Sequence, residues 1–533
     1  MWARKARKDI QTTKGCQLRK RLFRSGMIVS SMTMLSRVVG LLRDGVLAAM
    51  FGAGGGADAF FVAFKIPNFL RRLFGEGAFA QAFVPVLAET MGRDPNDPRA
   101  VRALVAAVSG VLFAVLALVT LAVVMASDYV VWVFAPGFAA DPAKLGLAGD
   151  LLQLTFPYLF FIAGVAFAGS ILNAHDRFAV PAFTPVLLNL SLIASAIWLS
   201  PHLEVSVMAL GWGVLIAGAT QLAFQLPFLA RLGLLPRPRW QPRDPGVRQI
   251  GRLMLPALFG VGVSQINLLL DTILASFLEN GSVSWLYYSD RLVELPLGVI
   301  GIAIATVILP KLSHAAAAKT PDATNQIQDW GLGICVILGV PATAALWLLA
   351  EPLLTTLFLY GALELRDVTQ ASLSLRAYAL GLLPFMFIKV LAPGYFSRQD
   401  TRTPVRIAIW AMVANMAFNL ALIGPLAHVG LAAATSLSAA LNAGLLWLGL
   451  RRRGWYQPRL GWRRLMVQVG VSSAVMAAVL AVVAVQIGEF SQLSMLARAG
   501  WAAVLVGSGV ASYVAGLLVL GFKPAGWLGS ERD

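Results

Sequence analysis

Long apolar segments recur along the chain from residue 26 to residue 521 and are separated by short polar loops. Each segment has roughly 20 residues, enough for a helix to cross a hydrocarbon core of about 30 Å. The segments lack the period-two alternation of membrane strands, and a helix satisfies all its backbone groups internally. The pattern therefore predicts an all-α polytopic membrane protein. Fourteen candidate transmembrane helices are expected at residues 26–50, 58–88, 103–126, 150–172, 179–200, 205–230, 250–278, 284–310, 329–350, 367–396, 404–423, 427–449, 465–487 and 498–521.

The composition agrees with a membrane protein and excludes several other classes. Of the 533 residues, 58% are hydrophobic and only 13% are charged, with a mean hydropathy of +0.74. This is more apolar surface than a water-soluble domain can bury. Aliphatic residues dominate throughout, which excludes collagen and disordered chains. The two cysteines, Cys16 and Cys335, offer no disulfide framework.

The basic residues predict how the chain is oriented in the membrane. With the N-terminus inside, 32 of the 43 lysines and arginines lie in segments that face the cytoplasm, and only Lys144, Arg366 and Arg498 lie in the opposite loops. The positive-inside rule therefore places both termini in the cytoplasm, with residues 1–25 as a basic cytoplasmic N-terminal extension. The net charge of +17 follows from this orientation. Because the basic clusters adjoin helix ends, no nucleic-acid partner is expected.

Short motifs repeat at a near-constant offset, which indicates an internal duplication. Pro85 and Pro310 lie in similar apolar pentapeptides 225 residues apart, and the Thr-Pro pairs ending at Pro185 and Pro404 are 219 residues apart. We therefore expect two six-helix lobes related by pseudo-two-fold symmetry, followed by two extra C-terminal helices. The expected parts are an N-lobe at residues 26–235, a C-lobe at 236–455, and the two extra helices with a short cytoplasmic C-terminus at 456–533.

Charged residues cluster in three of the predicted helices, although a charge inside a membrane costs about 2.5–3.5 kcal/mol on insertion scales. Arg37 lies about 18 Å along the first helix, too deep to reach either surface easily. These residues either form salt bridges that lock helices together or converge in a water-filled cationic chamber. Arginine dominates the set, and its planar guanidinium suits phosphate, so an anionic head group is the candidate ligand. The candidate substrate-binding residues are Arg37, Arg43, Asp44, Asp58, Lys65, Arg71, Arg72, Glu76 and Arg291.

Several long strings of residues are recognisable. They are residues 31–40 (SMTMLSRVVG), 58–68 (DAFFVAFKIPN), 285–292 (WLYYSDRL) and 391–400 (LAPGYFSRQD). The chain closely resembles the MurJ (MviN) family of lipid II flippases, which belong to the multidrug/oligosaccharidyl-lipid/polysaccharide (MOP) exporter superfamily. The resemblance extends over essentially the whole chain from residue 26 onward.

The resemblance implies a lipid transporter of the bacterial cytoplasmic (inner) membrane. Its members move lipid II, the undecaprenyl-diphosphate-linked peptidoglycan precursor, from the inner to the outer leaflet by alternating access. Family arginines matching Arg37, Arg43, Arg71, Arg72 and Arg291, with an acid matching Asp44 or Asp58, line the central cavity. The two extra C-terminal helices form a groove for the lipid tail. The implied partners are lipid II, membrane lipids and cell-wall synthesis proteins, and a monomer is expected.

A sodium site in the distal lobe is known in some relatives, and the resemblance places its counterpart at four polar residues. The matching positions are Asp271, Asn415, Asn419 and Thr435. Their oxygens suit a hard cation, although the relatives have a second acid where Asn419 stands. Ordinary hydrogen bonds between helices are the alternative. No other cofactor is expected, and Na⁺ would be a coupling ion.

Other functions fit the sequence less well. A MATE-like small-molecule cation antiporter of the same superfamily predicts a cavity dominated by acids, whereas this set is dominated by arginine. A nonenzymatic scaffold for cell-wall synthesis would survive neutralisation of every cavity charge. No enzyme is expected, because the four histidines are isolated and no loop is long enough to carry clustered catalytic groups.

Overall fold

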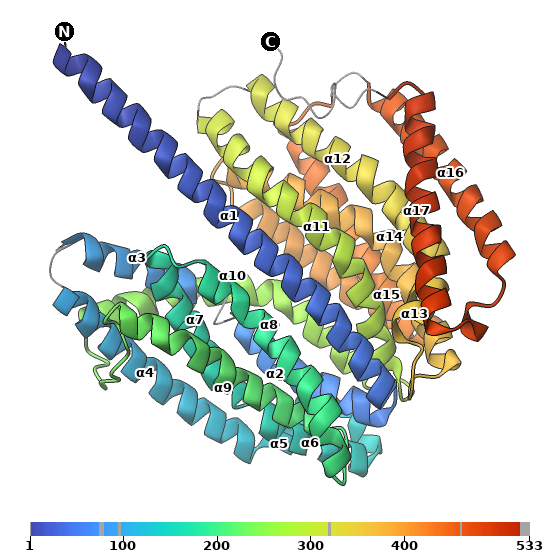
Figure 1. Ribbon diagram of the computed structural model, residues 1–533, viewed down its shortest axis with the longest axis horizontal. Helices are drawn as coiled ribbons and strands as arrows, with labels where there is room; N and C mark the ends of the chain where they lie inside the picture. Colours follow the sequence, from blue (N-terminus) through green and yellow to red (C-terminus); the bar gives the residue numbers. More distant parts are fainter. Residues whose placement is uncertain (1, 74–78, 94–97, 318–320, 459–460, 523–533) are drawn as a thin grey trace. The chain divides into compact units, whose positions relative to one another are not determined.

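The computed structural model describes residues 2–73, 79–93, 98–317, 321–458 and 461–522, so Glu76 of the candidate set lies outside the described residues. The described residues form helices and no strand (Figure 1). The α-helices are α1 (Trp2–Phe51), α2 (Gly55–Leu73), α3 (Phe79–Arg93), α4 (Pro98–Met125), α5 (Ser127–Phe134), α6 (Pro142–Thr155), α7 (Tyr158–Ala174), α8 (Ala179–Ala194), α9 (Met208–Arg231), α10 (Pro245–Ala275), α11 (Ser282–Ala317), α12 (Pro321–Leu348), α13 (Ala350–Phe358), α14 (Leu365–Phe396), α15 (Arg402–Arg452), α16 (Trp462–Ile487) and α17 (Met495–Val519).

The prediction of an all-α polytopic membrane protein is confirmed. Within the described ranges, nine helical segments are long and apolar enough to cross a membrane. They include the 28-residue α4 and the paired α16 and α17 near the C-terminus. The number fourteen itself stays a prediction.

One predicted helix is interrupted in the structure, and one predicted break between helices is observed. The predicted helix at residues 150–172 is divided between α6 and α7, because Pro157 has no N–H group to continue the helical ladder. The break predicted between the helices at 404–423 and 427–449 is observed within α15, which turns sharply at Ala427 (φ 47°, ψ −129°). This left-handed φ is unusual for a residue with a side chain, so the turn is locally strained.

The described chain forms two compact units. Unit 1 comprises Met1–Leu47, Val62–Val133 and Asp141–Gln265, and unit 2 comprises Ala48–Phe61, Phe134–Ala140 and Ile266–Asp533. The division between the units at residues 265 and 266 thus falls within α10. The lobes expected at residues 26–235 and 236–455 stay a prediction.

The core of unit 1 is aromatic. The rings of Phe79 and Phe83 on α3 stack with their centroids 5.3 Å apart, and Phe167 on α7 lies 5.1 Å from Phe83. Val105 on α4 and Leu229 on α9 complete the same buried cluster. Close packing of these side chains holds four helices against one another and places α7 beside α9 (Figure 1).

Unit 2 is built around α14, which packs against α11, α12 and α15. The helices α16 and α17 lie side by side and pack against α12 (Figure 1). Their buried cluster includes Val469 and Leu480 of α16 and Leu505 of α17. The Tyr513 hydroxyl donates to the Ile337 carbonyl at 2.6 Å, which ties α17 to α12 by a directed contact.

Candidate functional site

The first candidate group in unit 1 centres on Arg43, which is held from two sides. Its Nε donates to Asp44 Oδ1 at 2.9 Å, and its Nη2 contacts the same oxygen. Its Nη1 donates to Asn189 Oδ1 on α8 at 3.0 Å, and Asn189 in turn donates to the Ser36 carbonyl at 3.0 Å. Asp44 is fully buried, so it balances the buried charge of Arg43. Arg43 thus forms a buried ion pair with its neighbour on α1.

Asn189 was not singled out from the sequence. It is one amide in the apolar segment predicted at residues 179–200, and its partner Arg43 is 146 residues away. The only available signal was a buried polar residue type within a membrane-length helix, which must find a hydrogen-bonding partner.

The remaining candidates in unit 1 are half-buried. Arg37 lies on α1, and Lys65, Arg71 and Arg72 lie on α2. Arg71 Nε donates to Asn68 Oδ1 at 2.9 Å, one helical turn away. Arg71 and Arg72 occupy the last turn of α2, where the helix dipole favours positive charge. Partial exposure leaves these cations accessible to an anionic ligand.

Asp58 in unit 2 caps another helix. Its Oδ2 accepts from the Gly281 N–H at 2.8 Å, and its Oδ1 accepts from the Ser284 N–H at 2.9 Å and the Ser284 hydroxyl at 2.7 Å. Asp58 as a whole is 1% exposed. It therefore satisfies orphan donors at the start of α11 and favours that helix end electrostatically.

The helix capped by Asp58 carries Arg291. The Arg291 Nη1 lies 3.2 Å from Glu294 Oε2, one turn further along α11. The arginine side chain is 22% exposed and the glutamate 42% exposed. An i,i+3 ion pair with an exposed glutamate contributes little to stability, about 0–1 kcal/mol.

The four residues predicted as a cation site lie together in unit 2. Asn419 Nδ2 donates to Asp271 Oδ1 at 2.8 Å and to Asn415 Oδ1 at 3.1 Å. The Thr435 hydroxyl lies 3.4 Å from Asp271 Oδ2 and donates to the Leu431 carbonyl at 3.0 Å. The cluster thus joins α10 to both halves of α15.

Two buried amide oxygens in and beside this cluster lack hydrogen-bond partners among the described residues. Asn419 is fully buried, yet its Oδ1 has no hydrogen-bond partner among the described residues, and neither has Asn267 Oδ1 on the preceding turn of α10. A buried acceptor without a donor is costly, and a cation would satisfy it. Within the described ranges, no group of three or more His, Cys, Asp or Glu residues could hold a metal ion.

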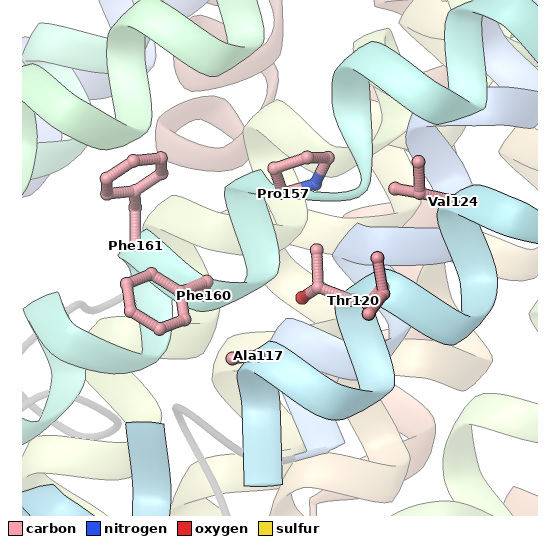
Figure 2. Close-up of a pocket in the computed structure, with 7 residues that line it drawn as sticks. Ala117, Thr120, Val124, Pro157, Phe160 and Phe161 are labelled. Carbon is pink, nitrogen blue, oxygen red and sulfur yellow. The ribbon is translucent and has the colours of Figure 1, made fainter. Parts of the chain in front are cut away.

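An apolar pocket of about 410 Å³ lies in unit 1, between α4 and the start of α7. Figure 2 shows Ala117, Thr120 and Val124 facing Pro157 and the rings of Phe160 and Phe161. None of the lining residues is charged, so this pocket cannot hold a diphosphate.

A polar cluster fixes the loop between α14 and α15, outside the apolar segments. Asp400 accepts from the Thr403 hydroxyl at 2.7 Å and from the Thr403 N–H at 3.0 Å, and it pairs with Arg453. The two bonds from Thr403, with help from Arg453, hold the pKa of Asp400 at about 2. This carboxylate is thus a structural anchor that stays charged at physiological pH.

Comparisons with known proteins agree with this architecture. A family model described as "Lipid II flippase MurJ" matches residues 47–499. A protein of Vibrio cholerae serotype O1 named "Probable lipid II flippase MurJ" is 50% identical over 511 residues, which cover 95% of this chain and 97% of that protein.

Two solved structures show the same fold. The one described as "Lipid II flippase MurJ, inward closed conformation" has a TM-score of 0.78 at 24% identity, covering 92% of this chain and 98% of that one. A multidrug resistance MATE family transporter of the MOP superfamily, in an inward-facing conformation, has a TM-score of 0.63 at 16% identity. That match covers 81% of this chain and 98% of the transporter.

Proposed function

Because the chain belongs to the lipid II flippase MurJ family, we propose that it moves lipid II from the inner to the outer leaflet of the bacterial inner membrane by alternating access. The observation that carries this proposal is 50% identity to a probable lipid II flippase over 95% of the chain. Flipping makes and breaks no covalent bond, so it requires no catalytic residue. The proposal has both termini in the cytoplasm and a single copy of the chain as the transporting unit.

The proposal assigns the diphosphate of lipid II to the arginines predicted from the sequence. The set is Arg37, Arg43, Arg71, Arg72 and Arg291, with Lys65 and Glu76 nearby in sequence. Bidentate guanidinium–phosphate pairs are strong and geometrically specific, and each charge-assisted hydrogen bond contributes about 1.5–3 kcal/mol. Asp44 would orient Arg43, and Asp58 would position the helix that carries Arg291.

The lipid tail needs an apolar surface open to the bilayer. On α16 and α17, Val482, Val485, Val510 and Leu518 are well exposed, which suits contact with hydrocarbon. We assign the tail to these two helices, which residues 456–533 contain.

A coupling ion is the second part of the proposal. The cluster of Asp271, Asn415, Asn419 and Thr435 would bind Na⁺, with the unpartnered Asn419 Oδ1 and the Asp271 carboxylate as its main ligands. A cation bound there would join α10 to α15 more tightly than the hydrogen bonds alone.

The MATE-like fold keeps a cation antiporter as the second candidate function. That function needs carboxylates that are available to a cationic substrate. Asp44 Oδ1 is already bonded to Arg43, and both oxygens of Asp58 accept from Gly281 and Ser284. Among the described residues, Asp44 Oδ1 and both oxygens of Asp58 are thus bonded to protein groups, which favours an anionic substrate.

The test is rescue of cells depleted of their own flippase. We expect Arg37→Ala, Arg71→Ala and Arg291→Ala each to abolish rescue while protein abundance stays normal. Arg93→Ala is the matched control, because Arg93 forms an exposed pair with Glu89 on α3 and should be dispensable. Full rescue by all three variants would overturn the assignment of the diphosphate. Such a result would favour the alternative in which the chain acts as a scaffold for its expected partners, the cell-wall synthesis proteins.

A further inference from the structure

The linker between α9 and α10 is fixed against α4. The Arg239 N–H donates to the Ala106 carbonyl on α4 at 2.9 Å. A Cβ at Gly110, one turn further along α4, would lie 2.0 Å from the Arg239 carbonyl oxygen, so only glycine allows the linker this close. Asp244 then caps α10 by accepting from Gly246 N–H at 2.9 Å. Residues 232–244 are therefore a defined backbone segment, held at its centre and at its end.

This segment displays cations around one aromatic residue. Trp240 is 63% exposed, and the arginines at positions 237, 239 and 243 are all exposed. None of these three guanidinium groups forms an ion pair in the described part of the chain. Prolines at positions 236, 238 and 242 limit the backbone freedom between them. An exposed tryptophan among unpaired arginines on a rigid segment indicates a surface built to meet a partner.

The length of α4 gives the depth of this segment in the membrane. Ala106 lies 19 residues before Met125, the last residue of α4, which is about 29 Å along a helix. The hydrocarbon core is about 30 Å thick. If Met125 lies at one boundary of the hydrocarbon core, Ala106 lies at the other. The hydrogen bond between Arg239 and Ala106 then brings Trp240 to the level of that second boundary. The strong exposure of Leu118, Leu121 and Met125 shows that this side of α4 is suited to lipid.

We propose that residues 235–243 form a membrane-surface anchor in which Arg237, Arg239 and Arg243 bind the phosphates of anionic phospholipids while Trp240 inserts at the interface. Tryptophan prefers this depth, and arginine side chains extend from it to the phosphate layer. Each basic residue near an anionic surface strengthens the attraction to it. The anchor does not depend on the transported substrate, so it stands apart from the proposed function.

The test is local quenching of a fluorophore next to Trp240. The full-length C16S/C335S variant carries an NBD group at Q241C and is placed in vesicles of equal parts phosphatidylcholine and phosphatidylglycerol. In one set of vesicles the phosphatidylglycerol carries a nitroxide near the top of its acyl chain, and in the other set the phosphatidylcholine carries it. The ratio of the two lipids is the same in both sets. We expect stronger quenching by labelled phosphatidylglycerol than by labelled phosphatidylcholine. In R237Q/R239Q/R243Q, quenching by the two labelled lipids should be equal. W240A should weaken quenching by both lipids.

The matched control is R402Q/R406Q/R452Q, which removes three exposed positive charges from unit 2 and should leave the lipid preference unchanged. Equal quenching by the two lipids in the parent would overturn the anionic-lipid site. Absence of quenching by either lipid would show that the linker faces water, and would overturn the membrane anchor in favour of an acidic soluble partner.

Discussion

Asn189 on α8 accepts a hydrogen bond from Arg43 on α1 at 3.0 Å and uses its own amide to bind the Ser36 carbonyl on the same helix. One side chain thus fixes the orientation of a buried guanidinium and joins two helices of unit 1. The arrangement makes Asn189 a positioning residue for a candidate ligand of the substrate.

Asn189→Ala should destabilise the protein by about 1–3 kcal/mol, because Arg43 and the Ser36 carbonyl both lose a partner in a buried setting. Thermal unfolding of the purified protein in detergent measures the loss. Asn173→Ala is the control, since Asn173 is exposed at the end of α7. Equal unfolding midpoints for the two variants would show that the Arg43–Asn189 contact carries no free energy.

Asp58→Asn should also destabilise the protein, by about 2 kcal/mol. The new amide N–H₂ would face either the Gly281 N–H or the donors of Ser284, so a donor would meet a donor. Ser284→Ala removes only the hydroxyl bond to Asp58 and should cost about 1 kcal/mol. Thermal unfolding of both variants measures this, and Asp58→Asn should have the lower midpoint. A larger loss for Ser284→Ala would contradict the capping role of Asp58.

Sodium should stabilise the parent protein against thermal unfolding relative to choline at equal ionic strength. A ligand present at 100 times its dissociation constant stabilises the folded state by about 2.7 kcal/mol. Asp271→Asn should abolish this shift, whereas Asp322→Asn, at an exposed acid near the start of α12, should retain it. The same midpoint in both salts would mean that the cluster on α10 and α15 is held by hydrogen bonds alone.

Asp400 should make stability depend on pH in the acidic range. Its pKa of about 2 lies below the value of about 3.9 expected for an unfolded aspartate. The stabilisation is therefore fully present above about pH 4 and is lost as the pH falls towards 2. Asp400→Asn should lower the unfolding midpoint at neutral pH, and the difference from the parent should shrink below pH 4. A difference that stays constant from pH 7 to 3 would contradict this assignment.

Hydrophobic length was enough to predict an all-α polytopic membrane protein, because a membrane helix must be both apolar and about 20 residues long. It predicted the break after residue 423 but could not give the backbone conformation of the sharp turn at Ala427 within α15. Nor could it show that the contacts divide the chain inside α10.

The candidate site could be predicted only where the residue type carries the signal. Intramembrane charges such as Arg43 and Asp58 stand out at once, whereas their partners Asn189 and Ser284 are ordinary polar residues 146 and 226 positions away. Such pairs depend on tertiary packing, which no local pattern encodes. The gathering of Asp271 with Asn415 and Asn419 was reached through resemblance to relatives, and helical spacing alone would have linked only the two asparagines.

The most direct measurement is the arrival of lipid II at the outer leaflet in cells that depend on this chain, followed with a membrane-impermeant reagent that cleaves diphosphate-linked lipids. We expect the parent and Arg93→Ala to expose the lipid at the same rate. Arg71→Ala and Arg291→Ala should each expose it at least about tenfold more slowly, because each loses a charge-assisted bond to the diphosphate. Exposure at the parental rate by both variants, at normal protein abundance, would contradict diphosphate binding by these arginines.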